Sequence, residues 1–119
     1  MYNENDLARI ISINKKLKSI FVIIQRHNGI VKALEDEDEG QPALLMLLVA
    51  IAEQFSKLQK NNSAILSEFN DIDLKGIISV RNFVAHDYDG VSFSVIENGL
   101  RYEIPILLEI TNNILDNNH

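Results

Sequence analysis

One octet of the chain, residues 81–88, gathers side chains that can perform acid–base chemistry on a phosphate. It reads Arg-Asn-Phe-Val-Ala-His-Asp-Tyr, which gives the spacing R-x4-H-x-Y for Arg81, His86 and Tyr88. Histidine titrates near neutral pH and can therefore give or take a proton, and arginine offers a planar fork of donors to phosphate oxygens. Asn82 lies one helical turn before His86 and is expected to orient the imidazole through an i, i+4 hydrogen bond.

The octet is expected to form the last two turns of a helix. It follows the apolar run at residues 77–80 and comes shortly before Gly90, a residue type that often ends helices. On an unbroken helix of about 100° per residue, Arg81 and His86 diverge by roughly 140°. A single ideal helix therefore cannot direct both groups at one atom. This geometry favours a composite site, formed at a distorted helix end or with a second copy of the chain.

Each of these residues also has an ordinary structural interpretation. A single arginine near an apolar face usually extends along it to reach water, and a single histidine is usually a hydrogen-bonded surface or core residue. From the spacing alone, a catalytic role for Arg81 and His86 is a hypothesis.

The segment at residues 72–88, IDLKGIISVRNFVAHDY, resembles the signature of the HepT-like proteins, whose pattern is R-N-hydrophobic-hydrophobic-small-H-x-Y. These proteins are a branch of the HEPN (higher eukaryotes and prokaryotes nucleotide-binding) superfamily. The resemblance continues upstream through Gln41-x-Ala43 and through residues 51–58, which are similar to the family's I-G-E-A-x-x-K-L helix, and downstream to Pro105. It covers nearly the whole chain.

The chain departs from the family pattern at positions outside the reactive residues. Ala52 stands where the family often has Gly, Asp73-Leu74 where it often has Pro-Trp, and Ser79 where it often has Gly. These differences bear on packing and subfamily more than on chemistry.

The resemblance implies a fold and an activity. The implied fold is all-α: a single domain over residues 1–119 that forms an antiparallel four- to five-helix bundle and dimerises through its motif-bearing side. The implied activity is that of a metal-independent ribonuclease toxin, with two copies of the motif lining one cleft between protomers. His86 would then be the acid/base for RNA cleavage, with tRNA as one candidate substrate, and Arg81 the phosphate clamp.

The resemblance also implies a control mechanism and a partner. In HepT-like proteins the tyrosine of the motif can be modified with AMP by a minimal nucleotidyltransferase, the antitoxin. Carried over to Tyr88, this modification would place bulky negative charge beside Arg81 and repel RNA. Tyr88 is otherwise expected to contact RNA.

Two other functions stay open at this point. The chain could be a non-catalytic HEPN module that binds a nucleotide or substrate for a separate nucleotidyltransferase, which its acidic balance favours. It could also be a dimeric helical protein in which Arg81 and His86 hold an interface together through hydrogen bonds. The presence of Arg81, Asn82, His86 and Tyr88 together favours the ribonuclease.

Composition limits the class of protein. The net charge of −6 argues against a general nucleic-acid binder, so any RNA activity must use a local patch. The chain has no cysteine, which excludes disulfides and thiolate metal sites and suits a reducing cytoplasm. Its longest apolar run, residues 43–52, is about half of what a membrane-spanning helix needs. We expect a soluble cytoplasmic protein without a cofactor.

Hydrophobic spacing predicts a long first helix that ends near Asn28-Gly29. Three basic residues, Lys15, Lys18 and Arg26, fall on the face opposite its apolar stripe. They form a possible contact for RNA phosphates, although a solvated face of an amphipathic helix is the more common explanation of such a pattern. Five consecutive acidic residues, 35–39, follow and predict a solvated loop.

A second long helix is expected from about Pro42, with an apolar stripe from Leu44 to Leu58 and a first half that is apolar on nearly all sides. Either residues 70–71 or Asp73 should cap the motif helix. Residues 91–104 are ambiguous, because their alternation and the Asn98-Gly99 pair locally favour a β-hairpin. The HepT-like resemblance implies helix there, and we follow the resemblance.

Overall fold

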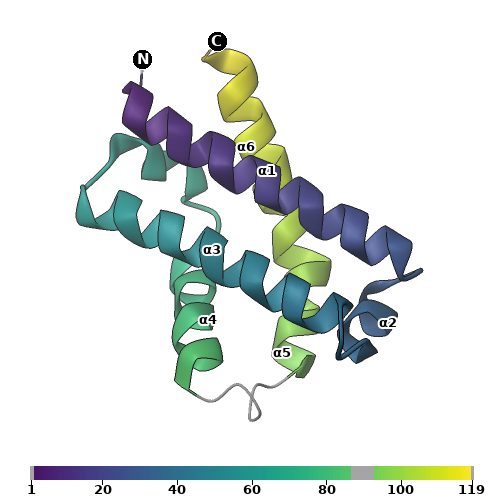
Figure 1. The fold of residues 1–119 in the computed structure, drawn as a ribbon. Helices are drawn as coiled ribbons and strands as arrows, with labels where there is room; N and C mark the ends of the chain where they lie inside the picture. The colour runs from purple at the N-terminus through teal and green to yellow at the C-terminus, as the bar shows by residue number, and fades with distance from the viewer. Residues whose placement is uncertain (1, 87–92, 119) are drawn as a thin grey trace.

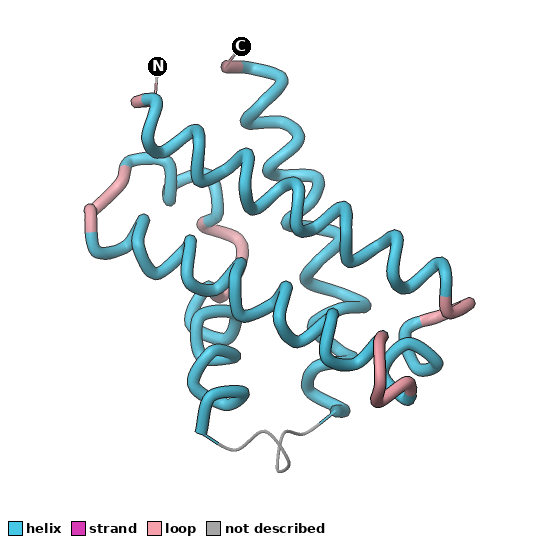
Figure 2. Tube along the Cα trace, in the orientation of Figure 1, coloured by secondary structure: helices cyan, strands magenta, loops and turns pink. Residues whose placement is uncertain are grey.

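The computed structural model describes the backbone of residues 2–86 and 93–118 and the side chains of residues 2–84 and 93–118. Every regular element in this part of the chain is a helix, which confirms the all-α prediction (Figure 2). The elements are α1 (Glu4–Arg26), α2 (Ile30–Glu35), α3 (Gly40–Lys60), the 3₁₀ helix η1 (Ala64–Phe69), α4 (Leu74–His86), α5 (Phe93–Asn98), the π-helix η3 (Gly99–Glu103) and α6 (Ile104–Asn117).

The four long helices form a bundle around α3. Figure 1 shows α1 and α3 running side by side in opposite directions, with the short α2 joining them at one end. Helix α4 packs on α3, and α6 packs on α1. The last turn of α4 and the short α5 lie at the same end of the molecule, opposite the end where α1 begins and α6 finishes (Figure 1). Dimerisation stays a prediction.

The first helix has a side-chain cap at its start and ends as its sequence predicts. The side chain of Asn3 caps the helix by accepting a hydrogen bond of 2.8 Å from the amide of Asp6. The helix stops at His27, after which Asn28 and Gly29 adopt positive φ angles of 61° and 141°. Glycine and asparagine tolerate this left-handed region best, so the predicted end near these two residues is confirmed.

Helix α3 supplies the centre of the core. The predicted stripe is buried in full, and Leu45 and Ala52 are buried beside it; the stripe comprises Leu44, Leu48, Ile51, Phe55 and Leu58. The ring of Phe55 meets Phe69 of η1 edge to face, with centroids 5.0 Å apart. The helix begins at Gly40, two residues earlier than Pro42, and Asp36 accepts hydrogen bonds from the amides of residues 38–40 at this start.

The acidic segment at residues 35–39 is only in part the solvated loop that its charge predicts. Glu37, Asp38 and Glu39 are exposed. Glu35 instead closes α2, and Asp36 is half-buried and bonded to His27. The negative charge of Asp36 is thus stabilised by hydrogen bonds from His27 and from backbone amides.

Residues 93–104 are helical, so the locally favoured β-hairpin is wrong and the helix implied by the family resemblance is right. The strand-like alternation conceals a helical spacing, because Ile96, Leu100 and Ile104 are all buried one turn apart. Burial of this face overrides the turn preference of Asn98-Gly99, which lies instead where α5 passes into the π-helix η3. Residues 91 and 92 lie outside the described part.

Candidate functional site

The motif-bearing helix α4 is positioned by a cap and by one apolar face. Asp73 accepts a hydrogen bond of 3.0 Å from the amide of Lys75, so Asp73 is the cap at the helix start. Ile77 is buried, and the partly buried Ile78, Val80 and Val84 pack against the same core. This packing leaves Arg81, Asn82 and Phe83 exposed near the end of the helix.

The side chain of Arg81 contacts the neighbouring helix α3. Its Nε lies 3.4 Å from Oε1 of Glu53, and the two side chains are 53% and 45% exposed. Among the described residues, Arg81 makes no other ion pair or hydrogen bond. No hydrogen bond to Nη1 or Nη2 is found within the described residues, and the Arg81 side chain is 53% exposed, so these nitrogens can meet a ligand. An arginine held in this way can form a bidentate pair of hydrogen bonds with a phosphate.

Arg81 and Glu53 line a groove between α3 and α4. The rest of the groove is apolar and has a volume of about 270 Å³; its walls are Pro42, Leu45, Met46, Val49 and Val84. Met46 is 68% exposed, so its side chain offers apolar surface to solvent beside the ion pair. The guanidinium thus stands beside apolar surface rather than in a basic cluster.

His86 is the last residue of α4, and the helix is continuous from Leu74 to His86. Arg81 and His86 therefore keep the helical separation of roughly 140° that the sequence predicts, so a single undistorted helix does not bring them together. The side chain of His86 and all of Tyr88 lie outside the described residues. The expected Asn82 to His86 hydrogen bond and the expected convergence of two protomers thus stay predictions.

The three basic residues of α1 are at the surface but apart from Arg81. Lys15, Lys18 and Arg26 are exposed, as expected for the outer face of this helix. Helices α1 and α4 each pack on α3, which lies between them in Figure 1. In a single protomer these residues therefore do not flank the guanidinium. Their role as an RNA contact stays a prediction.

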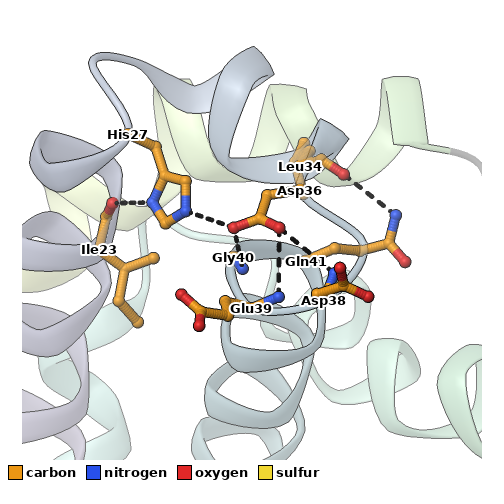
Figure 3. A network of polar contacts seen from close by, with 8 residues as sticks. All are labelled: Ile23, His27, Leu34, Asp36, Asp38, Glu39, Gly40 and Gln41. Atoms are coloured by element: carbon orange, nitrogen blue, oxygen red, sulfur yellow. Dashed lines mark hydrogen bonds and ion pairs between the residues drawn. The ribbon is translucent and has the colours of Figure 1, made fainter.

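A second polar cluster joins the end of α1 to the start of α3, and sequence reasoning did not identify it. Figure 3 shows the imidazole of His27 between the carbonyl oxygen of Ile23 and the carboxylate of Asp36, with a distance of 2.8 Å at each ring nitrogen. Asp36 also accepts from the amide of Gly40 at 3.2 Å. The only sequence signal was the acidic residue close to a helix start, which was read as part of a charge run.

This cluster perturbs the titration of both partners. Hydrogen bonding to the Ile23 carbonyl and then to Asp36 raises the pKa of His27, and the negative charges of Asp36 and Glu39 add to this effect. The bond from His27, followed by the amide of Gly40, lowers the pKa of Asp36. Both shifts favour the charged forms, the imidazolium of His27 and the carboxylate of Asp36. We assign this cluster a structural role, because its polar groups form hydrogen bonds with one another.

The sequence also missed Glu53, although it lies in the segment that resembles the family's I-G-E-A-x-x-K-L helix. Nothing in its spacing from Arg81 reveals the contact, which depends on how α3 packs against α4. Within the described residues, no three His, Asp or Glu side chains form a metal site, and no helix is long and apolar enough to cross a membrane.

Comparison with known families agrees with the helical fold. Residues 10–114 match the model of the family described as "HepT-like: Ribonuclease HepT-like". The match spans α1 to α6 and includes Glu53, Arg81 and His86. The chain therefore belongs to the HepT-like ribonuclease family. No curated protein and no solved structure shows significant similarity to it.

Proposed function

We propose that the protein is a ribonuclease toxin that cleaves RNA in a cleft formed by two copies of the chain. The observation that carries this proposal is Arg81, a solvent-exposed guanidinium inside the family-matched region whose terminal donors have no partner among the described residues. It lies on the same continuous helix as His86, a residue whose type can serve as both acid and base.

In the proposed reaction, His86 acts as general base and general acid, and Arg81 stabilises charge. A base removes the proton from a ribose 2′-hydroxyl, and the oxygen attacks the adjacent phosphorus. A bond from phosphorus to the 2′-oxygen forms while the bond to the 5′-oxygen breaks, and an acid returns a proton to the leaving oxygen. Arg81 neutralises the negative charge that accumulates on the phosphorane oxygens. The products are a 2′,3′-cyclic phosphate and a 5′-hydroxyl.

Two protomers resolve the geometric difficulty of one helix. Because Arg81 and His86 diverge around α4, Arg81 of one copy and His86 of the other can approach one phosphate only if two α4 helices face each other. Two copies also supply two imidazoles, so one can act as the base while the other acts as the acid. Asn82 would orient His86 by hydrogen bonding.

Control of this site would act through Tyr88. We propose that a partner nucleotidyltransferase, acting as antitoxin, transfers AMP to the Tyr88 hydroxyl. The added phosphate would compete with RNA for Arg81 and repel the RNA backbone. Tyr102, which is 64% exposed on η3, provides a matched control. Tyr88→Phe should escape modification while Tyr102→Phe is modified like the wild type, and equal modification of Tyr88→Phe would exclude this role.

Expression in a bacterial host tests the proposed activity. Growth should stop and tRNA or other cellular RNA should be cut in cells that express the wild-type chain, and both effects should vanish with His86→Ala. If cells that contain folded wild-type protein grow normally with intact RNA, the ribonuclease proposal fails.

A second candidate is a non-catalytic module that binds a nucleotide or substrate for a nucleotidyltransferase. The net charge of −6 and the pairing of Arg81 with an acid both favour it, because a nuclease that grips RNA broadly would carry more unpaired cations. Its signature would be tight nucleotide binding by a chain that leaves RNA intact.

A further inference from the structure

Glu53 and Arg81 form the ion pair that links α3 to α4 at the candidate site. We propose that Glu53 is a positioning residue, which holds the Arg81 guanidinium with its terminal edge directed at the RNA phosphate. This inference rests on the proposed function, in which Arg81 is the phosphate clamp.

The contact uses only one part of the guanidinium. Arginine carries five N–H donors, one on Nε and four on the two terminal nitrogens. Glu53 Oε1 lies 3.4 Å from Nε, on the side edge of the group. The end edge, formed by Nη1 and Nη2, has no partner among the described residues. The carboxylate therefore restricts the orientation of the guanidinium. It does not occupy the Nη1 and Nη2 atoms, which best match two phosphate oxygens.

The surroundings of the pair favour orientation over stability as its role. Both side chains are about half exposed, and exposed ion pairs contribute little to folding because water and salt screen them. Arginine has many rotamers, so a free Arg81 would lose considerable conformational freedom on binding phosphate. A guanidinium that Glu53 already holds loses less conformational freedom when phosphate binds. It therefore adopts the phosphate-binding geometry more often.

The guanidinium lies in a groove whose other residues are mostly apolar. Arg81 and Glu53 line it together with apolar residues of α3, among them Val49, and with Val84 of α4. Apart from the thioether of Met46, which is a weak acceptor, the other groove residues carry no polar side-chain atom, so Glu53 is the charged group in the groove that can orient Arg81. Without Glu53, the guanidinium of Arg81 would be free to rotate toward solvent.

Three substitutions separate orientation from charge. Glu53→Gln keeps an oxygen that can accept from Nε, whereas Glu53→Ala removes the acceptor, and Glu53→Asp shortens its reach. Each purified variant is compared with the wild type in steady-state cleavage of a labelled RNA. The matched control is Glu97→Ala, which breaks the exposed ion pair of Glu97 with Arg101, of 3.0 Å, on α5 and η3.

The expected result is a graded loss. Glu53→Ala should lower kcat/KM by about 10- to 100-fold, the scale on which misplacement of a positioning group acts. Glu53→Gln should stay within about threefold of the wild type, because its amide oxygen still offers Nε an acceptor at the same reach. Glu53→Asp should fall between the two. Glu97→Ala should match the wild type, and thermal unfolding should be similar in all variants.

The result that would overturn the inference is cleavage by Glu53→Ala at the wild-type rate or faster, which would make Glu53 neutral or a competitor of phosphate. An equal loss in Glu53→Gln and Glu53→Ala would overturn it as well, since charge rather than orientation would then decide the rate. Arg81→Ala, measured in parallel, separates this question from the proposed function. If Arg81→Ala is inactive while Glu53→Ala is unaffected, only the positioning role fails; if Arg81→Ala cleaves normally, the phosphate clamp fails too.

Discussion

The two ring nitrogens of His27 both face groups that only accept hydrogen bonds. Nδ1 lies 2.8 Å from the carbonyl oxygen of Ile23, and Nε2 lies 2.8 Å from Oδ2 of Asp36. A neutral imidazole has one N–H and can satisfy only one of them, whereas the imidazolium satisfies both. The cluster that fastens the end of α1 to the start of α3 is therefore complete only when His27 is protonated and Asp36 is ionised.

This cluster predicts a pH dependence of stability. The pKa of His27 is raised above its usual 6.5, so its contribution is full below that value and is lost as the pH rises through the raised pKa. The pKa of Asp36 is lowered from 3.8, so its contribution is lost only as the pH falls through the lowered pKa. The pair should therefore stabilise the fold most between about pH 4 and pH 6.5.

A double-mutant cycle with His27→Ala and Asp36→Ala measures this coupling. Urea unfolding at pH 5.5 should give a coupling free energy that favours the native pair, and the same cycle at pH 9 should give a smaller one. Equal coupling at both pH values would mean that protonation of His27 does not contribute.

Gly40 is expected to tolerate no side chain. A Cβ at this position would lie 2.3 Å from the backbone oxygen of Ala33 and 3.0 Å from Nε2 of His27, so the start of α3 would have to shift. Gly40→Ala should destabilise the fold by about 1–3 kcal/mol, as overpacking usually does. Gly76→Ala is the control, because a Cβ there meets nothing within 4 Å and alanine favours helix. Chemical unfolding in which Gly40→Ala is as stable as Gly76→Ala would contradict this view.

Asn14 ties α1 to α6 through a buried amide. Its Nδ2 donates to Thr111 Oγ1 at 2.9 Å and to Asn112 Oδ1 at 2.8 Å. Asn14→Asp keeps the shape but removes both donors and introduces a charge, so it should cost about 2 kcal/mol or more at pH 7. The same change at the exposed Asn113 of α6 should stay within about 0.5 kcal/mol. Equal urea midpoints for the two variants would show that the α1 to α6 link is dispensable.

Much of the fold follows from the spacing of apolar residues. The stripes of α1 and α3 are readable because each spans several turns, and the end of α1 is marked by Asn28 and Gly29. Local reasoning failed at residues 93–104, where Asn98-Gly99 favours a hairpin but buried Ile96 and Leu100 require a helix. There the family resemblance carried information that propensity did not, since it reflects the packing of the whole chain.

The sequence places Arg81 and His86 on one helix but does not reveal the partner of Arg81. Spacing singled out Arg81 and its divergence from His86, because both depend only on the geometry of one helix. The pairing of Arg81 with Glu53 and of His27 with Asp36 depends on how helices pack and on how a turn closes. Such contacts between separate elements leave no periodic signal in the sequence.

The most direct test of the central claim is cleavage of a labelled RNA by purified wild-type chain and by His86→Ala, in buffer that contains a chelator. The wild type should cut the RNA and leave 2′,3′-cyclic phosphate ends, and His86→Ala should be slower by at least about 100-fold, the usual contribution of a general acid–base group. Folded wild-type protein that leaves RNA intact, or a His86→Ala variant that cuts as fast as the wild type, would contradict the account.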